Sequence, residues 1–269
     1  MRLVGQKHDR VGYERLMSGL LAVTLSAVVA TAPAGGWRVK ARKGDCAAPQ
    51  PFTDLRHCDF SGRNLGAVDL RGARLEGVKF ANAKLLDCNL SGAGLAGADL
   101  KWANLTGCNL TGADLTGADM FHVQLDGARL DHARLLDTNL FGANLNEVKA
   151  RDANFSSAFM KDVAMEESDF SRSIFWQSFM QRAVALESRF DQAVFREVVL
   201  TGASLEGASF AQAQVLDSLL NGTHLQGASF RDADLAGSHF RNARIQGADF
   251  TGARHLPGDL VERMAKKSR

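Results

Sequence analysis

The chain has 269 residues, a formal net charge of +2 and four cysteines. The charge divides unevenly, with +5 on residues 1–50, −6 on residues 51–250 and +3 on residues 251–269, which together make +2. The long central part is therefore close to neutral for its length. This argues against a dense basic surface that binds nucleic acid, and against a dense acidic surface that imitates it.

Residues 1–34 have the three parts of a secretory signal peptide. Four basic residues precede an apolar stretch over residues 16–32, and small residues follow up to Ala34. We expect cleavage after Ala34, which would place the protein in the periplasm or outside the cell. The alternative is an uncleaved membrane anchor, because the apolar stretch is close to spanning length. Several hydroxyl side chains within it, such as Thr24 and Ser26, favour cleavage.

The segment that follows, residues 35–51, is a basic tether. It carries Arg38, Lys40, Arg42 and Lys43. We expect this tether to become ordered only where it meets the next segment of the chain.

Residues 52–255 repeat every five residues without insertion or deletion. From Leu55 to Phe250, nearly every residue whose number is a multiple of five is Leu, Phe, Met, Ile or Val, and the residue two before it is small. A period of five fits neither a helix nor a single strand, so the pattern predicts a solenoid. All four prolines lie outside this segment, as expected because proline lacks the N–H that a paired β backbone needs.

The clearest repeats read Ala-(Asp/Asn)-Leu-(Thr/Ser)-Gly, for example Ala103-Asn104-Leu105-Thr106-Gly107. They closely resemble the pentapeptide-repeat family, and the resemblance covers about three quarters of the chain. It implies an all-β fold, a right-handed quadrilateral β-helix with four pentapeptides, or twenty residues, in each coil. About ten coils would stack over roughly 48 Å. One large and one small side chain of each pentapeptide are then expected to point inward.

The cysteines fall into two pairs on this repeat. Cys46 lies just ahead of the first coil and Cys58 at an inward position of it, and the spacing is compatible with a disulfide or with two free thiols. Cys88 and Cys108 are twenty residues apart and should stack in adjacent coils. We expect two buried thiols there, because parallel Cβ vectors hold the Cβ atoms further apart than a relaxed bridge prefers.

No pattern predicts chemistry. The histidines include no pair with metal-ligand spacing, and the serines and aspartates fill repeat positions, so coincidences of Ser, His and Asp follow from composition. The glycines recur at corners that favour positive φ and do not form a phosphate loop. The sequence predicts a protein that is not an enzyme and has no catalytic residue, cofactor or metal site.

One column on the predicted surface changes character along the chain. The residue before each central residue should face water. Every twentieth one is polar up to Asn139, apolar from Phe159 to Leu219, and polar again at His239. Apolar residues also appear on the adjoining side and at the corner between the two. We name these residues the apolar flank: Phe159, Ile174, Trp176, Phe179, Val194, Val199, Leu216 and Leu219.

Contiguous exposed apolar area usually marks an interface, so the apolar flank predicts a contact with a protein partner or with a second copy. The alternative is that these residues were selected for strand propensity and are only partly exposed. A second, smaller patch contains Phe121 and Phe141, twenty residues apart. Over residues 147–197, glycine also disappears from the corner position.

Residues 256–269 break the period. Pro257-Gly258-Asp259 reads as a turn or a helix start, and a short amphipathic stretch follows it. Since a solenoid needs its open end covered, we expect this segment to cap the final coil.

The sequence favours an exported, non-enzymatic scaffold that binds a protein partner or itself. The family resemblance adds an alternative, a DNA-mimicking regulator of a nucleic-acid enzyme such as a topoisomerase, as in the quinolone-resistance proteins. Duplex DNA as long as the predicted coils would carry roughly 28 negative charges. The net charge of −6 on residues 51–250 makes the chain a poor copy of it.

Overall fold

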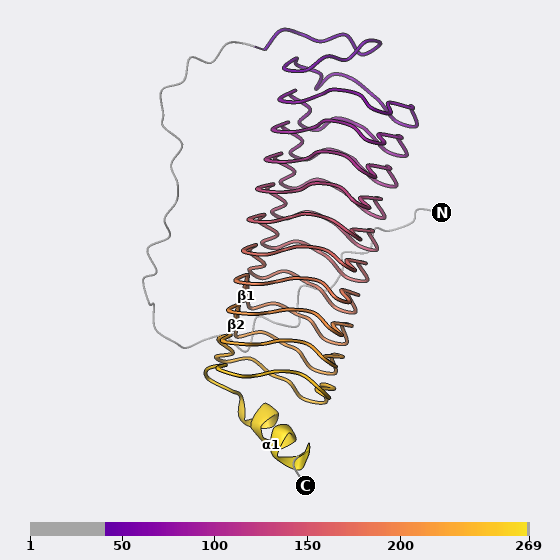
Figure 1. Ribbon diagram of the computed structural model, residues 1–269. Helices are drawn as coiled ribbons and strands as arrows, with labels where there is room; N and C mark the ends of the chain where they lie inside the picture. The colour runs from indigo at the N-terminus through magenta and orange to yellow at the C-terminus, as the bar shows by residue number, and fades with distance from the viewer. Residues whose placement is uncertain (1–40, 268–269) are drawn as a thin grey trace, which may run out of the picture. The chain divides into compact units, whose positions relative to one another are not determined.

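The structure, a computed structural model, describes residues 41–267, so the predicted signal peptide and residues 35–40 of the tether lie outside the described residues. In the described part the chain winds into a stack of coils that ends in one helix (Figure 1). Parallel pairing joins residues twenty apart, and one column runs unbroken from Asp54 to Arg254. The fold is the predicted right-handed quadrilateral β-helix.

The regular elements among the described residues are short. Strand β1 (Val194–Arg196) pairs in parallel with β2 (Gln214–Leu216), in the register Val194 opposite Gln214. Helix α1 spans Gly258–Lys267. Elsewhere each side of a coil offers a single paired residue, because the chain turns a corner after every pentapeptide.

The two inward residues of each pentapeptide build the core. The central residue donates its N–H to the next coil, as Leu95 does to the carbonyl of Asp114 at 2.7 Å. The outward residue donates to the preceding coil, as Asp114 does to the carbonyl of Ala93 at 3.0 Å. Leu95 and Ala93 are both buried. The backbone donors are therefore paired while the side chains alternate between core and solvent.

Phenylalanine rings replace leucine in one column of the core in its later half. Phe170, Phe190, Phe210, Phe230 and Phe250 form one stack, with centroids 4.8 to 5.3 Å apart. This spacing matches the distance between paired strands, so each ring lies on the equivalent ring of the next coil. The repeat thus produces offset aromatic stacking, which adds to the burial of apolar area.

Several small inward positions carry a hydroxyl. Ser168 is buried, and its Oγ donates to the carbonyl of Leu145 at 2.7 Å and accepts from the N–H of Val148 at 3.0 Å. The N–H of Ser168 in turn donates to the Oγ of Ser188 at 3.0 Å. The hydroxyls of Ser168 and Ser188 are both paired across coils, so they are buried without the cost of an unsatisfied polar group.

The corners that lack glycine form links between coils. Over residues 147–197 the backbone there is left-handed, with φ from 53° to 61° at non-glycine residues. Arg172 donates two hydrogen bonds to the carboxylate of Asp152, at 2.8 and 2.7 Å. Arg182 donates two to Asp162, both at 2.6 Å. Left-handed φ is costly for a residue with a Cβ, and these bonds offset part of that cost.

The corner pair of Asp162 and Arg182 predicts a pH dependence. The hydrogen bonds from Arg182 hold the pKa of Asp162 below its ordinary value. A lowered pKa stabilises the fold above the unfolded carboxyl pKa of about 3.9, and this contribution is lost as pH falls through the folded pKa. We expect Asp162→Asn to lower the free energy of unfolding by a few tenths of a kcal/mol at pH 7, and by less in acid.

Urea unfolding at pH 7 and at about pH 2.5 measures this difference. The matched control is Asp126→Asn, since Asp126 makes no ion pair with the described residues. An Asp162→Asn effect of equal size at both pH values would contradict the assignment.

Both ends of the described coils are covered. At the first coil, Lys43 pairs in parallel with Asp54, and Gly44 donates to the carbonyl of Asp54 at 2.9 Å. At the last coil, the carboxylate of Asp259 in α1 accepts the N–H of Phe240 at 2.8 Å, while Leu260 is buried in the core. Figure 1 shows α1 directly after the last coil. Helix α1 therefore closes the end of the solenoid.

No helix within residues 41–267 combines the length and the apolar character that crossing a bilayer requires.

Candidate interaction surface

The apolar flank lies on two adjoining sides of the β-helix and on the corner between them. The paired column runs from Asn139 through Phe159 and Phe179 to Val199 and Leu219. Ile174 and Val194 pair with each other on the adjoining side, and Trp176 and Leu216 lie at the corner. The fold thus brings together the eight residues that the sequence predicted as an interface.

Their exposure differs. Phe159, Ile174 and Trp176 are 40%, 39% and 48% exposed. The other five residues are partly buried: Phe179, Val194, Val199, Leu216 and Leu219. Partial burial of those five fits the strand-propensity interpretation as well as the interface. The three exposed side chains are large and apolar, and they carry the interface interpretation.

Aromatic rings connect the apolar flank with the smaller patch. The ring of Phe159 stacks on that of Phe179 at 5.6 Å and on that of Phe141 at 6.0 Å. Phe141 stacks in turn on Phe121 at 5.5 Å. Trp102, which is exposed, meets the edge of Phe121 at the same centroid distance of 5.5 Å. We name these five residues the aromatic run.

The two patches were predicted as separate because only residues twenty apart were compared. Phe141 and Phe159 are eighteen residues apart. Phe141 lies one residue before the corner residue Gly142, and Phe159 lies three residues before Asp162, the equivalent corner residue in the next coil. The same separation brings Lys101 to within 3.4 Å of Asp119, and Arg151 to within 2.7 Å of Asp169. A search at this spacing would have joined the patches.

Polar groups occupy the same column ahead of the apolar flank. The ammonium group of Lys101 lies 3.0 Å from the carboxylate of Asp99 and 3.4 Å from that of Asp119. The hydrogen bond with Asp99 is the main cause that raises the pKa of Lys101. Asn139 donates to Asp119 at 2.9 Å, so the polar network ends where the apolar column begins.

All four cysteines lie in the described residues, and all are bonded in disulfides. Cys46 and Cys58 are joined, with a Cα–Cα distance of 5.5 Å. Cys88 and Cys108 are also joined, with Cα atoms 4.5 Å apart, so our prediction of two buried thiols at that site was wrong. Stacking in adjacent coils brings their Cα atoms within the disulfide range, and the side chains turn toward each other instead of staying parallel.

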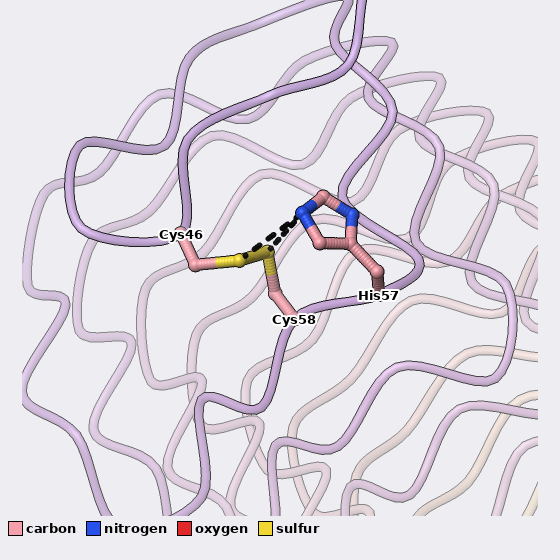
Figure 2. A group of neighbouring side chains, drawn as sticks. All are labelled: Cys46, His57 and Cys58. Atoms are coloured by element: carbon pink, nitrogen blue, oxygen red, sulfur yellow. Dashed lines mark hydrogen bonds between the residues drawn. A yellow bond between two sulfur atoms is a disulfide. The ribbon is translucent and has the colours of Figure 1, made fainter.

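His57 completes a group that sequence reasoning missed. Its Nε2 lies 3.5 Å from Sγ of Cys46 and 3.8 Å from Sγ of Cys58, and Figure 2 shows the ring turned toward both sulfurs. The prediction of no metal site considered only the spacing of the histidines from one another. The available signal was the position of His57, directly before a cysteine with a candidate partner in the tether.

Coils of twenty residues, left-handed corners and a stacked interior define the molecule as a β-helical solenoid with a five-residue period. The family model for pentapeptide repeats matches residues 53–156, 182–215 and 218–254, with eight copies. The chain belongs to the pentapeptide-repeat family.

Solved structures include relatives of this fold. The chain is similar to HetL, a pentapeptide repeat protein involved in heterocyst differentiation regulation in Nostoc sp. strain PCC 7120. Identity is 26%, coverage is 72% of this chain and 89% of that one, and the TM-score is 0.42. It is also similar to QnrB1, a plasmid-mediated fluoroquinolone resistance protein, with 17% identity, coverage of 77% and 91%, and a TM-score of 0.38. No curated protein matches the chain.

Proposed function

We propose that this protein is an exported, non-enzymatic scaffold that binds a protein partner or a second copy through the apolar flank. Pentapeptide-repeat proteins are generally non-enzymatic, which supports a scaffold rather than an enzyme. Export is proposed from the signal-peptide pattern of residues 1–34. The observation that carries the binding part of the proposal is the exposed ring of Phe159, which stacks on the partly buried ring of Phe179 and extends into the aromatic run.

Apolar rings on a paired backbone suit binding. Covering apolar area contributes about 25 cal/mol per Å². Phe159 and Phe179 belong to backbone that is already paired on both sides, so little chain entropy is lost when a partner orders them. Aromatic side chains on such a framework are the residues that most often dominate an interface.

Charge favours this scaffold over a DNA mimic. Several acidic side chains that could contribute to a negative stripe are paired with basic residues of a neighbouring coil. Asp54 lies 3.6 Å from Arg74, and Asp169 accepts a hydrogen bond from Arg151 at 2.7 Å. A mimic of duplex DNA needs carboxylates that remain unpaired and face outward.

Export is tested by cell fractionation followed by N-terminal sequencing of the native chain. We expect a mature protein in the periplasm or the medium that begins at Gly35, because small residues precede the expected cleavage site. Deleting residues 2–34 should leave the protein in the cytoplasm. An intact N-terminus in the membrane fraction would support the anchor instead, and a full-length native chain in the cytoplasm would refute export.

Association is tested separately, by replacing Phe159 and Phe179 together with Asp. Loss of a captured partner, or of a dimer, would support the apolar flank as the binding surface.

A further inference from the structure

We propose that Cys46, His57 and Cys58 bind a zinc ion when the disulfide between the two cysteines is reduced. The three side chains lie where the tether meets the first coil, away from the apolar flank. Their ligand atoms all lie within 4.8 Å of one another. Two thiolates and an imidazole are a ligand set that Zn²⁺ prefers.

The imidazole is already at ligand distance from both sulfurs. A tetrahedral zinc ion with Zn–S near 2.3 Å and Zn–N near 2.0 Å holds a sulfur and a nitrogen about 3.6 Å apart. Nε2 of His57 lies 3.5 Å from one sulfur and 3.8 Å from the other (Figure 2). To form such a site, only the distance between the two sulfur atoms has to increase, to about 3.8 Å.

The backbone that carries the ligands is held by contacts other than the disulfide. Arg63 donates from Nη1 to the carbonyl of Cys46 at 2.5 Å, and Asp54 donates its N–H to the carbonyl of Arg42 at 2.9 Å. Cys58 donates its N–H to Leu55 at 2.8 Å. Reduction would therefore leave both cysteines close to His57.

The reaction needs a dithiol reductant. Two electrons and two protons pass from the dithiol to the Cys46–Cys58 bond, which breaks into two thiols while the reductant closes into its own disulfide. Zn²⁺ then displaces the two thiol protons to solvent and takes the lone pair of Nε2 from neutral His57. His57 is exposed, so water can occupy the fourth position.

The consequence is a link that survives reduction. In the oxidised chain the disulfide joins the tether to the first coil, and in the reduced chain the zinc ion would join the same two points. The competing interpretation is that the imidazole only packs beside a structural disulfide. The two interpretations differ in what removal of His57 does to metal binding.

Cobalt titration of the full-length protein separates them. The protein for this titration is a variant with Cys88→Ala and Cys108→Ala, so that only one pair of thiols remains. It is reduced with dithiothreitol and desalted without oxygen. We expect one Co²⁺ per chain, a thiolate-to-cobalt absorption band, and displacement of the cobalt by Zn²⁺. His57→Ala should weaken Co²⁺ binding at least about tenfold. His132→Ala, which removes an exposed histidine elsewhere, should not.

Two outcomes would overturn the proposal: a reduced chain without a thiolate band, or a His57→Ala variant that binds Co²⁺ as tightly as its parent. The oxidised chain serves as the blank. If the Cys88→Ala, Cys108→Ala chain does not fold, the otherwise native reduced chain is compared with its Cys46→Ser variant. The readout uses the metal ion alone, so it does not depend on export or on a protein partner.

Discussion

Replacing Phe159 and Phe179 with Asp is expected to abolish association of the protein while its β-helix stays folded. Both side chains point outward from paired backbone, and neither belongs to the buried core. Each aromatic anchor of an interface contributes about 2 kcal/mol or more, and a carboxylate in its place must also be desolvated. Two such changes together weaken binding by about a thousandfold or more.

Sedimentation velocity measures self-association, and affinity capture from envelope extracts measures partner binding. The matched control is the double variant Asn89→Asp and Asn109→Asp, which introduces the same residue type at equivalent outward positions, also twenty apart. Its carboxylates can accept the N–H groups of Ser91 and Thr111, as the asparagines do. Association that persists in the Phe159 and Phe179 variant, with circular dichroism unchanged, would rule out the apolar flank as the binding surface.

Phe190→Ala is expected to lower the free energy of unfolding by about 3–5 kcal/mol, because it leaves a cavity in the core. Phe190 is fully buried between Phe170 and Phe210, with ring centroids 5.3 and 5.0 Å away. It also meets Phe175 and Phe195 edge-on, at 6.0 and 5.4 Å. The lost ring therefore contacts three successive coils.

Urea unfolding gives the size of this loss, and hydrogen exchange shows where it falls, since coils of a solenoid can open locally. We expect protection to drop most in the coils next to residue 190. Phe52→Ala is the control, because Phe52 is 64% exposed and should change stability by no more than about 0.5 kcal/mol. Equal losses in the two variants would mean that the internal ring stack does not stabilise the fold.

Most of this fold could be predicted from the sequence because a single short period determines register, core and corners together. Leu55 and Phe250 mark the limits of the repeat, and the structure pairs residues twenty apart between them. The hydroxyls at Ser168 and Ser188 were predicted only as small residues, since their bonds between coils depend on side-chain direction.

The candidate sites were less predictable. The apolar flank follows from counting in twenties, as between Phe159 and Phe179. The contact between Phe141 and Phe159 joins residues eighteen apart in adjacent coils, and its geometry is visible only once the coils are built. Free thiols were predicted at Cys88 and Cys108, where the structure has a disulfide, because the Cβ vectors were assumed to stay parallel. His57 was missed because it lies next to Cys46, which is eleven residues earlier in the tether and comes close only in the folded chain.

The unbroken repeat also limits how this molecule can change its length. Removing one pentapeptide between Phe141 and Phe159 would rotate everything after it by a quarter turn, and the two rings would then lie on different walls. Removing a full coil of twenty residues elsewhere in the stack would leave the remaining columns aligned. Insertions and deletions that preserve a continuous surface are therefore restricted to whole coils of twenty residues. The same rule applies to designed variants that shorten or extend the molecule.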